Sequence, residues 1–427
     1  MSLGEIRADM IPGGVRLVMD ILEKNGYEAY IVGGCVRDFL MRREPHDFDV
    51  TTSASPEQMK ECFKGMRLIE TGIKHGTLTV VIDGENVEIT TYRIDGKYTD
   101  GRHPESVTFT TRLEDDLSRR DFTVNAMAYS PKRGLVDAFG GVCDLENRLI
   151  RCVGEPDARF NEDGLRIIRA LRFSSVLDFD IEPSTSDSAV RNAALLRGIS
   201  VERIYTEFTK LLLGKRAGTL VRRYRSLIEV FLPLLARADD VEYSVAARAL
   251  DGCHLSASER YAMLLGVSFD TSLMSCEVTS IEDGLALLKS DIRTRKEAVS
   301  CFRAACEMGG DDARAARRDI RKYTYPTLDS AIALVLSLLY AQGDTGGASR
   351  LKKYRAIVEA EHMRPDACFT LKALKLDGKD LLLLGVRGAL VGRVLERLLD
   401  CVVDGTVKND RDALLDMASR IIESEKA

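Results

Sequence analysis

The sequence predicts an α+β protein, in which a small head with a mixed sheet is followed by an all-helical neck, body and tail. Short runs of β-branched residues, each bounded by turn residues, occur within about the first 135 residues, at 29–32, 48–52, 78–82 and 87–92. Beyond them, apolar residues recur with the helical period to the end of the chain. Aromatic residues make up only 6% and tryptophan is absent, so the cores must consist mainly of aliphatic side chains.

A length of 427 residues suggests roughly three domains, at about 150 residues for each. We expect a head at 1–138 and three helical parts: a neck at 139–213, a body at 214–341 and a tail at 342–427. Helical spacing in the neck is carried by two groups of apolar residues, Leu165, Ile168 and Leu171, and then Ile204, Phe208, Leu211 and Leu212. The polar segment 342–349, which contains three glycines, is the expected linker before the tail.

Charge and composition exclude several classes of protein. With 61 basic and 66 acidic residues the net charge is −5, which argues against a polycation that coats nucleic acid but allows a local basic groove. The longest apolar run, 331–340, is too short to span a bilayer, and the N-terminus has no signal-peptide pattern, so we expect a cytoplasmic protein without a membrane partner. The five histidines lack metal-binding spacing, so a metal site must be built from carboxylates.

The first candidate site is the pair Asp47 and Asp49. Residues two apart on a strand point to the same face, and two carboxylates so close together favour a hard cation such as Mg²⁺. Such a pair alone is also common on solvent-facing strands. Upstream, Gly34 and Arg37 follow an apolar run, and a glycine turn that leads into a helix lets backbone N–H groups approach a phosphate. Together these residues indicate a site for phosphate and metal.

Four segments in order, GGCVRD, HDFDV, SRRDFTVNAMAY and RFNEDGLRIIRALRF, resemble the bacterial tRNA nucleotidyltransferase and poly(A) polymerase family, the class II CCA-adding enzymes of the polymerase-β superfamily. The resemblance implies a nucleotidyltransferase that binds tRNA, CTP and ATP, in which Asp47 and Asp49 are catalytic and hold two Mg²⁺ ions. One ion would activate the RNA 3′-hydroxyl, and the other would neutralise the triphosphate and the leaving pyrophosphate. Glu88 is a candidate third carboxylate or simply a solvated strand residue.

The resemblance also implies a set of nucleotide contacts. Gly34 and Arg37 would contact the triphosphate, Arg120 the nucleotide, and Asp121 and Asn125 the ribose. The remaining contacts follow a spacing of three residues along a predicted neck helix, which is also typical of a solvated face: Asp163, Arg166, Arg169 and Arg172. In the family the first two of these read the base, and the following arginines contact the nucleotide.

Hydrogen-bonding chemistry explains how Asp163 and Arg166 could select bases. Cytosine and adenine both present an amino donor beside a ring-nitrogen acceptor, so a carboxylate can accept from the amino group while an arginine donates to the ring. Uracil and guanine place a carbonyl and a protonated nitrogen there, and both contacts fail. One protein pair would thus accept C and A and reject U and G.

The sequence favours complete CCA addition over three alternatives. The polar segment 95–106 corresponds to the family's flexible loop at full length, which argues against an enzyme that adds only CC. Segment 71–77 lacks the basic element of the related poly(A) polymerases. A non-catalytic RNA-binding relative is disfavoured because Asp47, Asp49, Arg120, Asp163 and Arg166 are all present. Segment 369–417 resembles the family's tRNA-binding tail, although a plain helical packing domain fits it nearly as well.

Overall fold

The computed structural model describes residues 3–82, 84–96, 106–267 and 278–426. They form two compact units, one of residues 1–216 with 224–231, and one of 217–223 with 232–427. Every strand that the structure describes lies in the first unit, and the described part of the second unit is helical, so the predicted α+β class is confirmed. Most of the segment 95–106 lies outside the described residues, as do 268–277.

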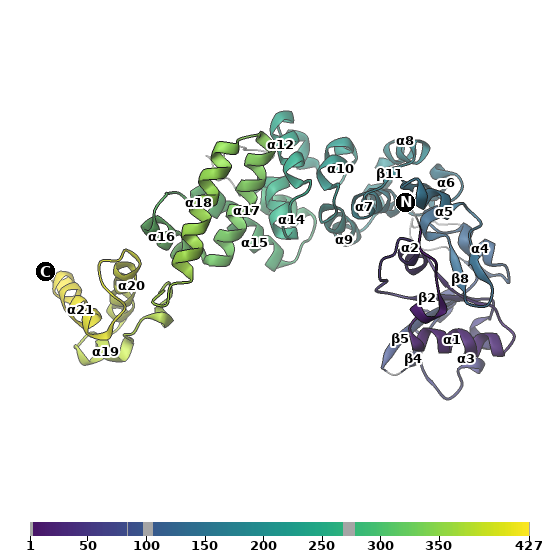
Figure 1. The fold of residues 1–427 in the computed structure, drawn as a ribbon, viewed down its shortest axis with the longest axis horizontal. Helices are drawn as coiled ribbons and strands as arrows, with labels where there is room; N and C mark the ends of the chain where they lie inside the picture. The colour runs from purple at the N-terminus through teal and green to yellow at the C-terminus, as the bar shows by residue number, and fades with distance from the viewer. Residues whose placement is uncertain (1–2, 83, 97–105, 268–277, 427) are drawn as a thin grey trace. The chain divides into compact units, whose positions relative to one another are not determined.

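A seven-stranded mixed sheet forms the centre of the first unit (Figure 1), in the order β3-β4-β5-β2-β1-β8-β9. Its strands are β1 (Ala29–Val32), β2 (Asp49–Thr52), β3 (Arg67–Ile69), β4 (Thr77–Ile82), β5 (Glu85–Thr91), β8 (Ala128–Ser130) and β9 (Gly134–Val136). Neighbouring strands are antiparallel except β2 and β5, which are parallel. Strand β2 therefore lies at the centre of the sheet, held by hydrogen bonds on both sides. Smaller two-stranded sheets pair β6 (Arg93–Asp95) with β7 (Val107–Phe109) and β10 (Leu149–Ile150) with β11 (Asp180–Ile181).

Strand β1 is buried along its whole length because helices cover both faces of the sheet there. Helix α1 (Gly13–Lys24) packs against β1, β2 and β5, and it also contacts α3 (Pro56–Cys62) (Figure 1). Helix α4 (Leu113–Ser118) contributes Leu113 and Leu117 to a core with Tyr30 and Val32 of β1. Helix α2 (Gly34–Leu40) begins directly after β1, which places it beside the site described below.

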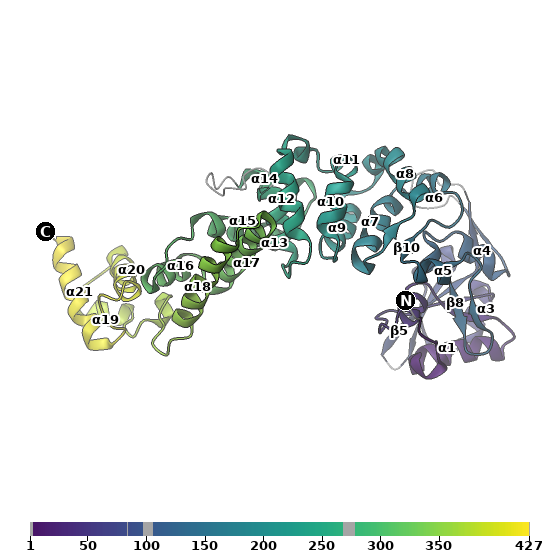
Figure 2. The ribbon, with the colours of Figure 1, turned by 45° about the horizontal axis from the view of Figure 1, so that its top comes forward.

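The neck contains helices α5 (Gly141–Glu146), α6 (Pro156–Glu162), α7 (Leu165–Leu177), α8 (Pro183–Arg191) and α9 (Val201–Leu212). Helix α7 contacts α6 and, more extensively, α9. The short helix α11 (Arg225–Ile228) belongs to the same compact unit. Helices α7 and α9 lie side by side (Figures 1 and 2). The apolar residues predicted to lie on one face of α9 are all buried: Ile204, Phe208, Leu211 and Leu212. This hydrophobic face fixes α9 against the rest of the unit and turns its polar residues toward other partners.

The second unit contains helices α10 (Ala217–Arg223), α12 (Asp240–Leu250), α13 (Ala257–Ala262), α14 (Thr279–Leu287), α15 (Ile292–Glu307), α16 (Ala313–Tyr323), α17 (Tyr325–Gln342), α18 (Thr345–His362), α19 (Gly378–Leu383), α20 (Ala389–Val403) and α21 (Arg411–Lys426). Two hydrophobic clusters fill its C-terminal half, one around α16, α17 and α18 and one around α19, α20 and α21. Among the described residues no single helix is long and apolar enough to cross a bilayer; α16 and α17 meet that test only together, across a bend of 111°.

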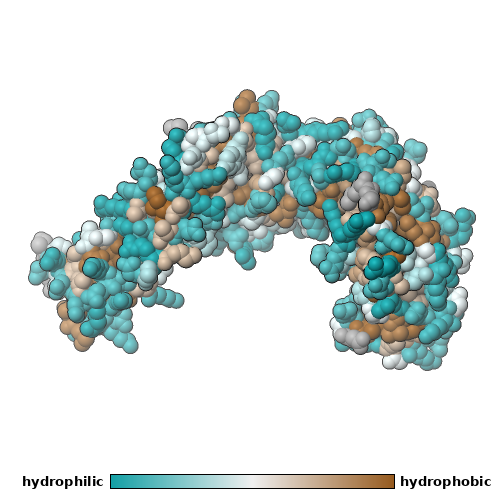
Figure 3. Space-filling view, in the orientation of Figure 1, coloured by the Kyte–Doolittle hydropathy of each residue, from teal (hydrophilic) through white to brown (hydrophobic). Residues whose placement is uncertain are grey.

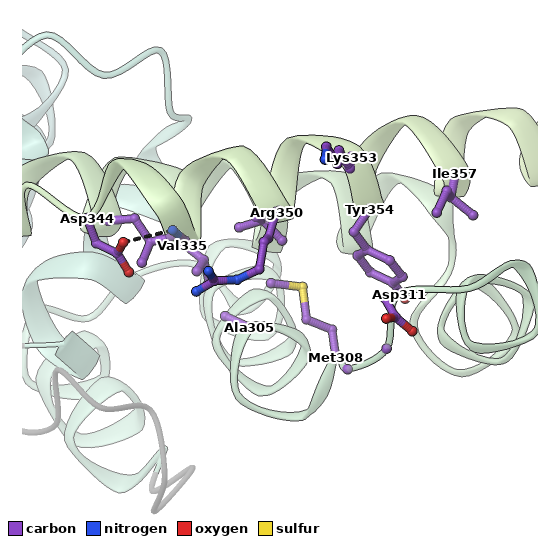
Figure 4. A pocket seen from close by; sticks show the side chains of 14 residues that line it. Ala305, Met308, Asp311, Val335, Asp344, Arg350, Lys353, Tyr354 and Ile357 are labelled. Atoms are coloured by element: carbon purple, nitrogen blue, oxygen red, sulfur yellow. Dashed lines mark hydrogen bonds between the residues drawn. The ribbon is translucent and has the colours of Figure 1, made fainter.

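The prediction that segment 342–349 is a linker is wrong. Gly343, at φ 79°, ends α17 in the left-handed conformation, and the Asp344 carboxylate accepts the Gly347 N–H at 2.8 Å to cap α18 (Figure 4). Ala348 is then buried in the cluster that also contains Leu336. The composition of the segment predicted a linker because a tight turn between two helices uses the same residue types, glycine and aspartate, as a flexible linker.

The surface of the helical unit is mostly hydrophilic on the face shown in Figure 3, with a brown hydrophobic area near α19. Three consecutive leucines there are exposed, Leu382 at 54%, Leu383 at 85% and Leu384 at 39%. They lie at the end of α19, whose buried residue Leu381 belongs to the core of this helical cluster. The exposed leucines are thus outside that core.

Candidate active site

Strand β2 places two carboxylates at its N-terminal end, in the middle of the central sheet. Asp49 is the first residue of the strand, and Asp47 lies two residues before it. Among the acids that border this cleft, all of which the structure describes, Asp38 and Asp121 pair with arginines, whereas the side-chain carboxylates of Asp47 and Asp49 have no hydrogen-bonding or ion-pair partner. Desolvation in the cleft raises the pKa of Asp49, Arg120 opposes that rise, and the charge of Asp47 adds to it.

The two unpaired carboxylates fit a magnesium site. Mg²⁺ keeps much of its hydration and is usually held by one or two carboxylates together with substrate phosphates. Among the described residues, no group of three or more His, Cys, Asp or Glu side chains is arranged to hold a metal ion. Glu88 pairs in register with Asp49 on the parallel strand β5. Burial, and to a lesser extent the charge of Asp49, raise the pKa of Glu88. Glu88 is not among the residues that line the cleft.

The turn after β1 makes room for an arginine. Gly33 has φ 83°, a conformation that favours glycine, and its N–H donates to the Met127 carbonyl at 3.1 Å. A Cβ atom at Gly33 would lie only 2.9 Å from Nη1 of Arg120. The glycine therefore allows the Arg120 guanidinium to reach the cleft beside Gly34, where α2 begins.

Arg37 is held in place from two directions. Its Nη1 donates to Oδ1 of Asn125 at 2.6 Å, and its Nε and Nη2 donate to the two oxygens of Asp38 at 2.9 and 3.0 Å. The side chain is largely buried, with 11% of its surface exposed. Asn125, which was predicted to contact the ribose, is thus also a partner of Arg37.

A fully buried carboxylate that the sequence analysis missed orients the arginine motif. Asp116 on α4 accepts hydrogen bonds from Nε and Nη2 of Arg119 at 3.0 and 2.7 Å, and its other oxygen lies 3.7 Å from Arg120. It also accepts the Thr51 hydroxyl of β2 at 3.3 Å. Asp116 therefore connects the strand that carries Asp49 to both arginines. Its spacing, three and four residues before them, is the signal that could have identified it.

Asp121 is an anchor for Arg169 in this structure. Its Oδ2 accepts from Nε and Nη2 of Arg169 at 2.9 and 2.6 Å, and its Oδ1 accepts from Asn125 and the Phe122 amide. Burial alone would raise the pKa of Asp121, but Arg169 and Asn125 outweigh it and lower the pKa to about 2. Both carboxylate oxygens are therefore engaged by protein donors.

This ion pair predicts a pH dependence of stability. Because the pKa of Asp121 is lower in the folded state than its ordinary value of 3.8, its contribution is complete above about pH 5 and is lost as the pH falls toward 2. We expect Asp121→Asn to lower the free energy of unfolding by about 2 kcal/mol at pH 7. Urea unfolding followed by circular dichroism should show this difference shrinking between pH 4 and pH 2. Asp20→Asn, at an exposed position of α1, is the control. If the difference in unfolding free energy between Asp121→Asn and the wild type stayed constant with pH, it would contradict the lowered pKa of Asp121.

The predicted row of polar residues does not lie on one helix. Helix α7 begins at Leu165, and Asp163 precedes it in an extended conformation, so the prediction that Asp163 lies on this helix is wrong. The reason is local: Oδ1 of Asp163 accepts the Leu165 N–H at 3.0 Å, which satisfies a free donor at the start of α7. Its Oδ2 accepts from Arg203 on α9 at 2.8 Å.

Arg166 is also bound by protein groups. Its Nη1 pairs with Oε2 of Glu162 at 2.6 Å, and its Nη2 donates to the Arg119 carbonyl at 3.0 Å. Neither Arg166 nor Asp163 is among the residues that line the cleft. Arg169 and Arg172, farther along α7, do line it. The structure thus divides the predicted row into an outer pair and two arginines at the cleft.

Phe173 gathers three guanidinium groups and was not recognised as a site residue. Its ring centroid lies 3.7 Å from the guanidinium carbon of Arg172, 5.3 Å from that of Arg37 and 5.4 Å from that of Arg169. Burial lowers the pKa of Arg172 to about 10, against the opposite effect of the Glu207 carboxylate. The negative face of an aromatic ring stabilises cations that would otherwise repel one another.

These elements enclose a cleft of about 470 Å³. It is lined by nine of the predicted site residues, Gly34, Arg37, Asp47, Asp49, Arg120, Asp121, Asn125, Arg169 and Arg172, together with Gly33, Cys35, Asp38, His46 and Phe173. The cleft therefore brings two unpaired carboxylates together with several guanidinium groups. Such an arrangement can hold a metal-bound polyphosphate.

Comparison with known proteins agrees with this chemistry. Residues 29–151 match the family "Poly A polymerase head domain", and residues 178–239 match "Probable RNA and SrmB-binding site of polymerase A". The CCA-adding enzyme of Streptococcus suis (strain 05ZYH33) is 33% identical, over 98% of this chain and the whole of that protein. That of Lactobacillus delbrueckii subsp. bulgaricus (strain ATCC 11842) is 50% identical over 46% of this chain and half of its own length.

Solved structures show the same likeness. The crystal structure of the Bacillus stearothermophilus CCA-adding enzyme in complex with CTP is 29% identical, with a TM-score of 0.75 over 97% of this chain and 99% of that one. The Thermotoga maritima CCA-adding enzyme complexed with tRNA has a TM-score of 0.63 at 21% identity, over 99% of this chain and all of that one, and shows a common fold.

Proposed function

Because this chain belongs to the family of bacterial CCA-adding enzymes, which are tRNA nucleotidyltransferases, we propose that it adds C, C and A in turn to the 3′ end of tRNA from CTP and ATP. The observation that carries this proposal is the pair of unpaired carboxylates, Asp47 and Asp49, in the same cleft as several guanidinium groups. The CTP bound to the Bacillus relative supports CTP as a substrate. Pyrophosphate is the expected second product.

The carboxylate side of the cleft serves the reacting atoms. Asp47 and Asp49 would hold Mg²⁺, which, when bound, would lower the pKa of the tRNA 3′-hydroxyl and neutralise the triphosphate. Glu88 pairs in register with Asp49 on the neighbouring strand and is the candidate for additional negative charge beside the two aspartates. Since both aspartates lack protein partners, their oxygens are available without breaking an existing ion pair.

The arginines of the cleft serve the triphosphate. We assign triphosphate binding to Arg37, Arg120, Arg169 and Arg172, all of which line the cleft. Their fixed positions, set by Asp38, Asp116, Asp121, Glu207 and Phe173, leave little reorganisation when the nucleotide binds. Gly34 lets the backbone approach the phosphates, and Asp121 and Asn125 are proposed to face the ribose.

Base selection is assigned to Asp163 and Arg166. The carboxylate accepts the amino group of cytosine or adenine, and the guanidinium donates to the neighbouring ring nitrogen. Protein side chains would thus act in place of a nucleic-acid template. We assign tRNA contacts to the segment 178–239, whose family match names an RNA-binding site, and to the tail, 342–427.

The experiment that tests the function uses tRNA lacking its last three nucleotides, incubated with one or two nucleoside triphosphates. CTP alone should extend the tRNA by two nucleotides, and CTP with ATP by three, while UTP and GTP should not be incorporated. Gel electrophoresis resolves these products at single-nucleotide resolution.

Each alternative gives a different product. Long extension from ATP alone would identify a poly(A) polymerase. A reaction that stops after two cytidines in the presence of ATP would identify a CC-adding enzyme. Binding of tRNA without any extension would identify a non-catalytic relative and refute the proposal.

A further inference from the structure

Helix α16 carries a stripe of arginines. The spacing i, i+3, i+4 and i+7, which places side chains on one face of a helix, is followed by Arg314, Arg317, Arg318 and Arg321. The buried residues of α16 are Ala316 and Ile320, and both belong to the hydrophobic cluster around α16, α17 and α18. The four arginines, called the arginine row below, are therefore available for contacts outside that cluster.

The arginine row meets the C-terminal end of α20, in the neighbouring cluster. Asp404, which follows α20, accepts two hydrogen bonds from Arg318 at 2.6 and 2.9 Å, and two from Arg314 at 3.4 and 3.0 Å. Hydrogen bonds from Arg318 and Arg314 lower the pKa of the Asp404 carboxyl. Glu396, on α20 itself, pairs with Arg321. Single surface ion pairs are weak, but bidentate pairs that share one carboxylate form a network with a defined geometry.

Arg317 reaches the backbone of the same helix end. Its Nε donates to the Val403 carbonyl at 2.6 Å, which satisfies one of the acceptors left free at the end of a helix. Gly405 makes room for this contact, because a Cβ atom there would lie 3.2 Å from Nη2 of Arg317. Nη1 of Arg317 binds Glu361 of α18 at 3.2 Å. One side chain, only 17% exposed, thus joins both clusters.

A cleft interrupts the apolar packing at this junction. Its volume is about 510 Å³, and it is lined from both clusters by Arg317, Glu361, Phe369, Val402, Val403 and Val407, among others. Phe369, in the connection between α18 and α19, packs against both hydrophobic cores. Among the described helices, the two clusters meet most extensively through α16 and α20. Charged contacts therefore carry much of the junction.

We propose that the arginine row is an ionic joint that fixes α19, α20 and α21, called the tail helices below, on α16, α17 and α18, and so positions them for tRNA. The inference rests on the proposed function, which assigns tRNA contacts to the tail. A binding surface that is already fixed loses less conformational freedom when RNA binds than a loosely attached one. Loss of the joint should therefore weaken tRNA binding and leave nucleotide transfer intact, because none of the joint residues lines the cleft that contains Asp47 and Asp49.

Limited proteolysis tests the joint independently of activity. Thermolysin cleaves before accessible apolar residues, and Phe369 becomes accessible when the two clusters separate. Asp404→Asn should increase the rate of cleavage before Phe369 by about fivefold, because cleavage follows the population of the open form. Asp329→Asn is the matched control, since it removes a bidentate pair with Arg355 inside one cluster. This control should be cleaved at the wild-type rate.

An exchange of charges separates the joint from a general loss of stability. Asp404→Arg should be cleaved faster still, because it places a positive charge against the arginine row. Adding Arg314→Asp and Arg318→Asp should return cleavage to near the wild-type rate, since the pairs form again with opposite signs. If Asp404→Arg does not fold, as judged by circular dichroism, the comparison of Asp404→Asn with Asp329→Asn decides. Equal cleavage of Asp404→Asn and the wild type, or an exchange that restores no protection, would overturn the inference.

Steady-state kinetics test the positioning of the tail helices. Asp404→Asn should raise KM for shortened tRNA by about fivefold and leave kcat and KM for CTP unchanged, because only the ordering of the tail helices is affected. Asp329→Asn should keep all three constants at their wild-type values. The sign of the change is decisive, since Asp404→Asn makes the protein more positive. A lower KM for tRNA would show that the freed arginines bind RNA phosphates themselves, and would overturn the inference, as would an unchanged KM despite faster proteolysis.

Failure of the inference can be distinguished from failure of the proposed function. A wild-type protein that adds no nucleotide to shortened tRNA refutes the function, while proteolysis still tests the joint and filter binding replaces KM as the measure of tRNA affinity. An active wild type whose Asp404→Asn variant matches it in proteolysis and in KM for tRNA refutes only the joint.

Discussion

Replacing Asp49 by asparagine should reduce nucleotide transfer by more than about a hundredfold while tRNA binding stays largely intact, and Asp47→Asn should behave in the same way. Both side chains border the cleft without a protein partner, so their removal breaks no internal ion pair. The loss would therefore reflect the reacting atoms, where a divalent cation neutralises charge that develops during transfer. Single-turnover extension of shortened tRNA at saturating CTP measures the rate, and filter binding measures tRNA affinity.

Two further aspartate variants serve as comparisons for Asp47→Asn and Asp49→Asn. Asp20→Asn, an exposed aspartate on α1 of the same unit, should transfer at the wild-type rate. Asp116→Asn should give an intermediate loss, because this buried carboxylate acts only by orienting Arg119 and Arg120. Retention of more than a few per cent of the wild-type rate in both Asp47→Asn and Asp49→Asn would exclude the proposed metal site.

The second large effect concerns which nucleotides are used. Arg166→Ala removes the donor to the ring nitrogen and Asp163→Ala removes the acceptor for the amino group, each a charge-assisted hydrogen bond of roughly 1.5–3 kcal/mol. That corresponds to about one to two decades in discrimination. We expect relaxed rejection of UTP and GTP rather than slower turnover alone. Measuring kcat/KM for all four nucleoside triphosphates on each variant tests this.

The arginines that line the cleft should behave differently. Arg172→Ala should weaken all four nucleotides alike, because phosphate contacts carry no base information. The Arg166 guanidinium also binds Glu162 and the Arg119 carbonyl, so Arg166→Ala removes contacts within the protein as well as the proposed contact to the base. Thermal denaturation of Arg166→Ala should therefore accompany the kinetics. Uniform losses for Asp163→Ala and Arg166→Ala would show that these residues do not read the base.

The two classes of result depend on different parts of the same unit. In the proposed function, transfer is assigned to residues of β2, which is fixed on both sides by hydrogen bonds within the sheet. Selection is assigned to residues at the start of α7, which are fixed by α9 and by α6. A substitution in the neck can therefore change selectivity while the chemistry at the sheet is retained.

The sequence by itself determined the elements of the head and most of the cleft. The predicted strands at 29–32, 48–52, 78–82 and 87–92 correspond closely to β1, β2, β4 and β5, because β-branched runs between turn residues specify strands locally. The paired aspartates and the glycine turn could also be recognised from local sequence. The aspartates are two residues apart on a strand, and the glycines lie directly before a helix. Nine of the predicted site residues border one cleft.

Only the tertiary structure decided how these residues are held. The partners Asp116 and Phe173 were missed, and the predicted linker at 342–349 proved to be a turn between packed helices. Asp163 and Arg203 are 40 residues apart in the sequence, and they meet because the apolar faces of α7 and α9 pack together. Local patterns specify which face of a helix is buried, but which charged residues then meet across two helices depends on how far each is rotated and shifted, and that is set by packing.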